Sequence, residues 1–89
     1  MATVAVTLPN VLARLFPGCV RQVELTASTV GDVIDALDSR WPGMRDRLCD
    51  STPAIRRHIN VFVDGERAKL DTRLVPDAKV VILTAISGG

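Results

Sequence analysis

The chain begins with two runs in which apolar and polar residues alternate. The runs cover residues 4–8 and 20–26, and the second sets Val23 and Leu25 against polar neighbours. A period of two is typical of a strand that buries one face. Pro17-Gly18 marks a turn between the runs, and residues 11–16 are ambiguous. The pattern therefore predicts a hairpin with a long, irregular connection.

A helical pattern follows the hairpin. Apolar residues recur three and four positions apart, at Val30, Val33, Ile34, Leu37 and Trp41. Ser28 or Thr29 is expected to cap this helix, and Asp32, three residues after Thr29, is close to a capping box. Pro42-Gly43 ends the helix, and residues 44–49 can add one further turn.

The second half of the chain returns to strands. Residues 58–63 alternate again, and Asp64-Gly65 is a strong hairpin turn signal, so residues 66–70 are expected to form the returning strand. Residues 79–84 are almost continuously apolar. Such a run favours a central strand with both faces at least partly covered.

The predicted order is two strands, one helix and three strands. One amphipathic helix must bury its apolar stripe against one face of one sheet, which defines a two-layer α+β domain. A β-grasp fold, with a mixed sheet of four to five strands packed on one main helix, satisfies this order. The 89 residues are enough for one domain only. We expect residues 1–86 to form the body and residues 87–89 a flexible diglycine tail.

Composition and charge exclude several classes of partner. Eleven basic and ten acidic residues leave a net charge of +1, so no strong field attracts nucleic acid or an anionic membrane. Phe16, Trp41 and Phe62 are the only aromatic residues, too few for a base-stacking platform. The aliphatic run at residues 80–83 is far shorter than the roughly 20 residues of a membrane helix. We therefore expect no nucleic-acid or membrane partner.

The cysteines and the N-terminal residues bear on location. Cys19 and Cys49 lie thirty residues apart and are expected to be reduced thiols. The first residues show no basic segment followed by a long apolar stretch, so no signal peptide is expected. Together these features predict a cytoplasmic protein.

Residue sets for catalysis or metal binding are missing from the pattern. His58 is the single histidine, and with Arg56 and Arg57 it forms either an anion site or, more simply, a solvated strand entry. Residues 32, 35 and 38 are aspartates on one side of the helix, which we interpret as a solvated face. No four-ligand zinc set is present. We expect no metal and no bound cofactor.

The C-terminal residues are the feature that a structural role does not explain. An apolar strand runs directly into a short tail ending in Gly88 and Gly89. Glycine adds nothing to a core, but without a Cβ its backbone can approach another protein closely. Residues 86–89 span at most roughly 14 Å when extended. That length is enough to enter the active site of a partner.

The chain resembles the ubiquitin-like sulfur carriers. This family includes the small subunit of molybdopterin synthase, the thiamine-pathway carrier and the cysteine-biosynthesis carrier of actinobacteria. The resemblance covers essentially the whole chain, and two segments carry it: RHINVFVDGE at 57–66 and VVILTAISGG at 80–89. Thr84-Ala85 stands where molybdopterin-synthase subunits often have prolines, so the branch of the family stays open.

The resemblance implies a mechanism at Gly89. An E1-like adenylyltransferase would use ATP to join the Gly89 carboxylate to AMP, and a sulfur nucleophile would then displace AMP to leave a thiocarboxylate. A sulfur-accepting synthase in molybdopterin or cysteine biosynthesis would take this sulfur. Ile86, Ser87 and Gly88 would form the tail. The chain would be a carrier and co-substrate that catalyses nothing itself.

Strand parity suggests where such partners bind. If residues 59, 61 and 63 face the helix, Phe62 points outward, and Val81, Leu83 and Ala85 point outward from the last strand. These four residues would form an apolar docking patch, unless another element covers them. Arg56, Arg57 and Arg67 would form either a polar rim for an acidic partner or a solvated face.

Two other functions fit the same residues. A ubiquitin-like protein modifier would form the same adenylate but end in an isopeptide bond to lysine. A passive β-grasp interaction domain would carry the two glycines without using them.

Overall fold

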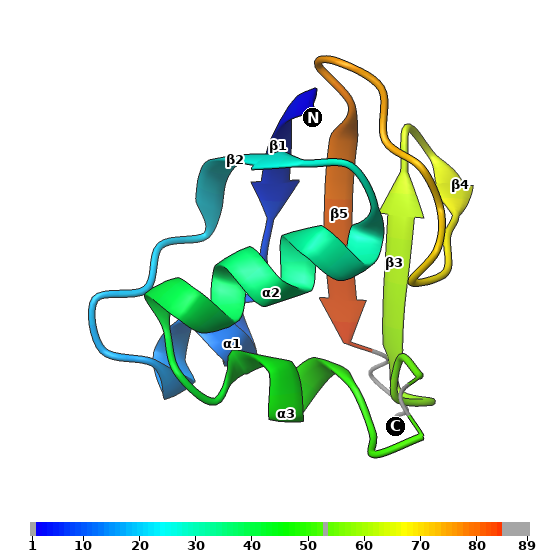
Figure 1. Cartoon of the computed structure of the whole chain (residues 1–89). Helices are drawn as coiled ribbons and strands as arrows, with labels where there is room; N and C mark the ends of the chain where they lie inside the picture. Colours follow the sequence, from blue (N-terminus) through cyan, green and yellow to red (C-terminus); the bar gives the residue numbers. More distant parts are fainter. Residues whose placement is uncertain (1, 53, 85–89) are drawn as a thin grey trace.

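A computed structural model describes residues 2–52 and 54–84. They form one five-stranded sheet with α2 packed against one of its faces (Figure 1). The elements are, in chain order, β1 (Ala2–Thr7), α1 (Asn10–Leu15), β2 (Gln22–Ala27), α2 (Val30–Arg40), α3 (Met44–Leu48), β3 (Ile59–Val63), β4 (Glu66–Arg67) and β5 (Lys79–Thr84). None of the helices in these residues is both long and apolar enough to cross a bilayer.

The sheet has the strand order β2-β1-β5-β3-β4 and is mixed. β1 pairs antiparallel with β2 and parallel with β5, while β3 pairs antiparallel with both β5 and β4. Val80 of β5 thus lies between Val6 of β1 and Val63 of β3. The expected mixed sheet and the central position of residues 79–84 are confirmed.

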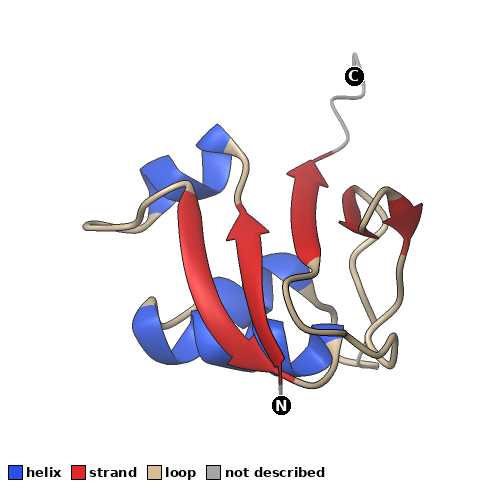
Figure 2. Ribbon diagram, turned by 90° about the horizontal axis from the view of Figure 1, so that it is seen from above, coloured by secondary structure: helices blue, strands red, loops and turns tan. Residues whose placement is uncertain are grey.

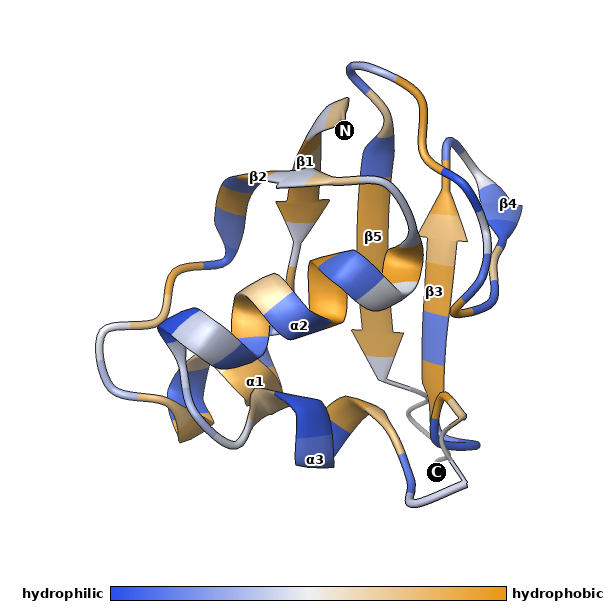
Figure 3. Ribbon diagram, in the orientation of Figure 1, coloured by the Kyte–Doolittle hydropathy of each residue, from blue (hydrophilic) through white to orange (hydrophobic). Residues whose placement is uncertain are grey.

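The alternating strands and the helical stripe meet in a single core. Every second residue of β1 and β5 is buried, and Figure 3 shows β5 as apolar over most of its length. The apolar face of α2 covers these residues. Side chains that are at most 1% exposed include Val4, Val6, Val30, Val33, Ile34, Leu37, Val61, Val80 and Ile82. Burial of this continuous apolar surface is the main force that holds sheet and helix together.

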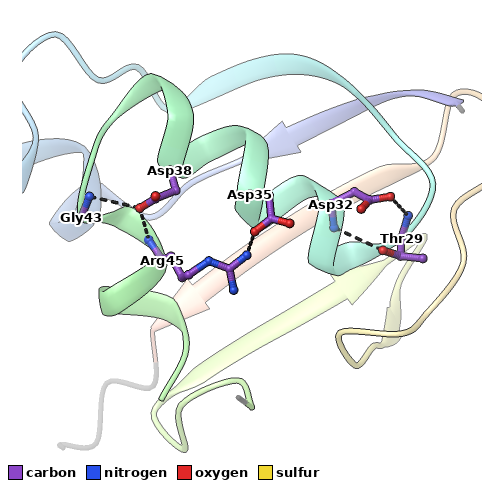
Figure 4. A network of polar contacts seen from close by, with 6 residues as sticks. All are labelled: Thr29, Asp32, Asp35, Asp38, Gly43 and Arg45. Atoms are coloured by element: carbon purple, nitrogen blue, oxygen red, sulfur yellow. Dashed lines mark hydrogen bonds and ion pairs between the residues drawn. The ribbon is translucent and has the colours of Figure 1, made fainter. Parts of the chain in front are cut away.

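The start of α2 is fixed by the predicted capping box. The Thr29 hydroxyl accepts a hydrogen bond from the Asp32 N–H at 3.2 Å, and the Asp32 carboxylate accepts one from the Thr29 N–H at 3.2 Å (Figure 4). Two N–H groups that a helix start leaves without partners are satisfied in this way.

The hairpin turn at Asp64-Gly65 is confirmed, but the strand after it is shorter than predicted. Both turn residues have positive φ, 51° and 86°, as a type I′ turn requires. β4 ends at Arg67, whereas the sequence pattern extended it to residue 70. The Leu70 carbonyl instead accepts a hydrogen bond from the Gly31 N–H at 2.8 Å. The chain leaves the sheet after Arg67 because its backbone carbonyl groups accept hydrogen bonds from N–H groups at the start of α2 instead of pairing with β3.

The connection between β1 and β2 contains a helix that the pattern left ambiguous. α1 is only six residues long and follows Pro9, whose carbonyl accepts hydrogen bonds from the N–H groups of Leu12 and Ala13. Leu12 alone in this helix is buried. A single buried position gives no apolar periodicity, so the sequence pattern could not identify this helix.

The three aspartates of α2 match the predicted solvated face only in part. Asp38 is half-buried and accepts hydrogen bonds from the N–H groups of Gly43 and Arg45, at 3.1 and 3.0 Å. Asp35 forms an ion pair with Arg45, and Asp32 belongs to the capping box (Figure 4). The interpretation was therefore wrong for Asp38, which binds backbone at the start of α3, whereas Asp32 makes the capping box that the sequence predicted.

Candidate functional site at the end of β5

β5 carries the chain to one end of the sheet, where the last described residue, Thr84, lies opposite Ile59 at the start of β3. Because β1 runs parallel to β5, α1, which follows β1, lies at this same end (Figure 2). Ala85, Ile86, Ser87, Gly88 and Gly89 lie outside the described residues. Their roles, and the boundary between residues 1–86 and 87–89, therefore stay predictions.

The outward-facing residues of β3 and β5 follow the expected parity. Phe62 pairs with Val81, and on its other side Val81 pairs with Thr7 of β1. Phe62 and Val81 are half-buried and Leu83 is 45% exposed. These three side chains lie on the sheet face opposite the buried core, as predicted. The binding of a partner by these side chains stays a prediction.

The three arginines predicted to form a rim come together beside β3. Arg56, Arg57 and Arg67 line one cleft of about 430 Å³, with Ile55 and Leu70 among its apolar walls. Two of the guanidinium groups are held within the protein. Arg67 donates to Asn60 Oδ1 at 2.7 Å, and Arg56 Nε donates to the Asp46 carbonyl at 2.8 Å.

A second cleft lies where β5 ends, and the sequence pattern missed most of it. We call it the α1–β5 cleft; its volume is about 720 Å³. Its lining residues come from α1 and the residue before it, α3, the start of β3 and the end of β5: Pro9, Asn10, Val11, Leu12, Arg14, Leu15, Arg47, His58, Ile59, Leu83 and Thr84. Leu83 is the one member that the predicted docking patch included, because the ambiguity of residues 11–16 hid the α1 side chains.

The two thiols are free, as expected. Cys49 is buried and Cys19 half-buried. Burial raises the pKa of both thiols above its ordinary value, and at Cys49 the nearby Asp50 raises the pKa further while Arg45 and Arg56 lower it. A raised pKa keeps a thiol protonated, and the protonated form is a poor nucleophile and metal ligand. Among residues 2–52 and 54–84, no group of three His, Cys, Asp or Glu side chains could hold a metal ion.

A mixed β-grasp sheet, one main helix and a final central strand define the class of ubiquitin-like proteins. A family model confirms the particular branch: the description "ThiS family" matches residues 6–89, and the chain belongs to this family of ubiquitin-like sulfur carriers. The resemblance seen in the sequence is thus confirmed.

Individual relatives fall into two groups. The sulfur carrier protein CysO of Mycobacterium tuberculosis is 33% identical over 92 residues, which cover 97% of this chain and 98% of the relative. A chain in the crystal structure of the BexX/CysO complex of Amycolatopsis orientalis superposes with a TM-score of 0.86 at 32% identity, covering 97% of this chain and 99% of that chain.

The second group consists of modifiers. The small archaeal modifier protein 1 of Haloferax volcanii is 32% identical over 62 residues, covering 70% of this chain and 71% of the relative. Its crystal structure gives a TM-score of 0.83 at 27% identity, with 99% of this chain and 100% of that chain covered. Carriers and modifiers therefore share this fold across their full lengths.

Proposed function

We propose that this protein is a cytoplasmic sulfur carrier that works through the carboxyl group of Gly89. The observation that carries the proposal is the match to CysO and the ThiS family over nearly the whole chain. The course of β5 supports it, because this strand ends at an end of the sheet bordered by exposed apolar residues.

The chemistry takes place at the last carboxylate. Its oxygen attacks the α-phosphate of ATP within an E1-like adenylyltransferase, forming an acyl-adenylate and releasing pyrophosphate. Hydrosulfide then attacks the carbonyl carbon, the bond to the AMP oxygen breaks, and the products are the thiocarboxylate, AMP and a proton. AMP is a far better leaving group than oxide, so activation precedes sulfur transfer. ATP is thus used by the partner and is not a cofactor of the carrier.

The body supplies binding and not catalysis. The tail loses conformational freedom on entering an active site, and contacts of the folded body must offset this cost. Phe62, Val81 and Leu83, with Ala85 beyond the described residues, are the proposed contacts on the open face. The sulfur would then pass to a synthase that makes either cysteine or a molybdopterin precursor. The similarity to CysO favours cysteine.

Intact-mass spectrometry tests the proposal directly. The chain is incubated with its adenylyltransferase, ATP and sulfide, and is compared with a chain that lacks Gly89. We expect the full chain to gain the mass difference between sulfur and oxygen, and the shortened chain to stay unchanged. A full chain that keeps its mass under conditions in which the enzyme hydrolyses ATP would contradict the proposal.

A second candidate function is protein modification. The similarity to the small archaeal modifier protein 1 of Haloferax volcanii is the specific observation that favours it. A modifier would use the same adenylate but would end in an amide bond between Gly89 and a lysine of another protein. Lysine-linked conjugates in cells, detected through the remnant of residues 80–89 that trypsin leaves on the modified lysine after cutting at Lys79, would support the modifier, and a thiocarboxylate without conjugates would support the carrier.

A further inference from the structure

The exposed apolar side chains of this protein are concentrated in one place. Among the residues that the structure describes, five large apolar side chains are strongly exposed, and three of them, Val11, Leu15 and Leu83, line the α1–β5 cleft with exposures of 47%, 47% and 45%. Isolated exposed apolar residues are normal on a protein surface, but residues that gather around one hollow mark a contact site.

The same cleft carries only basic ionisable groups. Arg14 comes from α1, Arg47 from α3 and His58 from the residue before β3, and none of the lining residues is a carboxylate. In the described part of the chain these three side chains have no hydrogen-bond or ion-pair partner. Arg45 and Arg56, by contrast, are bound within the protein. The cleft therefore offers two guanidinium groups and one imidazole to an outside partner.

The position of the cleft restricts that partner. Thr84, the last described residue, itself lines the cleft. The five residues that follow span at most about 17 Å when fully extended. An enzyme that encloses the carboxyl group of Gly89 must therefore bring its own surface close to the α1–β5 cleft.

We propose that the α1–β5 cleft is the docking site for the E1-like adenylyltransferase, and that the enzyme contributes an apolar side chain flanked by carboxylates. This inference rests on the proposed function and adds the chemistry of the partner to it. Val11, Leu15 and Leu83 receive the apolar side chain, and Arg14, Arg47 and His58 face the carboxylates. Complementary charge around an apolar centre selects one partner over others and speeds the encounter.

Charge reversal tests the basic side of the cleft. The variant Arg14→Glu/Arg47→Glu is compared with Arg21→Glu/Arg40→Glu, which makes the same change of net charge at exposed residues outside the cleft. Arg40 is a matched position because, like Arg14, it lies in the last turn of a helix. Pyrophosphate release is measured with the adenylyltransferase, ATP and a range of carrier concentrations.

We expect the cleft variant to raise the KM for the carrier by about tenfold or more with kcat changed less than about twofold, since docking and not chemistry is affected. The control variant Arg21→Glu/Arg40→Glu should keep the KM and the kcat of the natural chain. Added salt should raise the KM of the natural chain and lower that of the cleft variant, because salt screens the attraction in the first case and the repulsion between carboxylates in the second. Thermal unfolding of the cleft variant, together with the same measurements on the milder Arg14→Gln/Arg47→Gln variant, shows whether a raised KM reflects misfolding.

The apolar side has its own matched pair. Leu15→Ala in the cleft should raise KM about threefold to tenfold, whereas Val75→Ala, at a residue that is 60% exposed elsewhere, should not. Equal KM values for the natural chain and both cleft variants would overturn the inference while leaving the proposed function intact. A natural chain that the enzyme never adenylates would overturn both.

The alternative occupant to be tested is the chain's own tail. Amide NMR spectra are compared for the full chain and for a chain that ends at Thr84 in a C-terminal amide, which places no new carboxylate in the cleft. Unchanged shifts at Val11, Leu15 and His58 agree with a cleft that is open to the enzyme. Shifts that move at these residues when the tail is removed would assign the cleft to the tail and contradict the proposal.

Discussion

The Asp38 carboxylate of α2 accepts a hydrogen bond from the backbone N–H of Arg45, the second residue of α3, at 3.0 Å. The same oxygen accepts from the N–H of Gly43 at 3.1 Å, so one side chain fixes the start of the next helix. Gly43, the residue before α3, has no side chain that could do this. Asp38 therefore acts as a helix cap supplied from a neighbouring element.

Replacing Asp38 by Ala should lower the free energy of unfolding by about 1–2 kcal/mol, because two half-buried N–H groups lose their acceptor. Asp38→Asn keeps an acceptor oxygen and should recover most of the loss. Urea unfolding measures both. The control is Asp35→Ala, which removes only an ion pair whose Arg45 and Asp35 side chains are 40% and 57% exposed. That variant should change stability by less than about 0.5 kcal/mol, and equal losses in both variants would contradict the capping role.

The capping box of α2 gives a second prediction. Thr29→Ala removes the hydroxyl that accepts from the Asp32 N–H and should cost about 1 kcal/mol of stability. Thr29→Ser retains the hydroxyl and should stay near the natural value. Ser39→Ala, at an exposed position of the same helix, should be neutral or slightly stabilising, since alanine has the higher helix propensity. Thermal unfolding of the three variants distinguishes a cap from a general effect of alanine.

Adjacent residues of β5 should separate stability from partner binding. Val80 is fully buried, so Val80→Ala should lower the free energy of unfolding by about 2 kcal/mol. Val81 faces the open side of the sheet, and Val81→Ala should cost clearly less stability but weaken binding to the adenylyltransferase. Chemical unfolding and titration calorimetry measure the two effects. A Val81→Ala variant that binds as tightly as the natural chain would remove this residue from the proposed docking patch.

The Cys49 thiol predicts a pH dependence of stability. Burial raises its pKa in the folded state, so folding favours the protonated form. This contribution is present below the pKa of an unfolded thiol, about 8.5, and is lost as the pH rises through the folded value. Stability measured by denaturant between neutral and alkaline pH, under reducing conditions, should fall less steeply in Cys49→Ala than in the natural chain. Cys19→Ala, which leaves the more deeply buried thiol in place, should retain most of the fall.

Much of the fold was predictable from the sequence because its strongest signals are local. The two-residue period of the strands, the capping box at Thr29 and the turn at Asp64-Gly65 each depend on residues close together in the chain. The apolar run of residues 79–84 also indicated a central strand correctly. The matching family model confirms the resemblance read from the segments 57–66 and 80–89.

The elements that the sequence did not predict depend on contacts between distant residues. β4 ends early because the Leu70 carbonyl accepts a hydrogen bond from Gly31, almost forty residues earlier in the chain. The role of Asp38 requires α3 to fold back beside α2. The α1–β5 cleft likewise joins Val11 to Leu83, and no periodicity in the chain relates two such residues. Strand parity could identify Leu83, but only the tertiary structure shows that α1 lies next to it.

The place of β5 between β1 and β3 has a consequence for biosynthesis. Within the residues that the structure describes, the two earlier hairpins do not pair with each other in the sheet, and β5, which is synthesised after both, lies between them. A nascent chain that stops short of Thr84 can form local turns but cannot close its sheet. Premature termination would therefore leave a body open to proteolysis, and a partner that recognises the finished sheet would select chains translated through that strand.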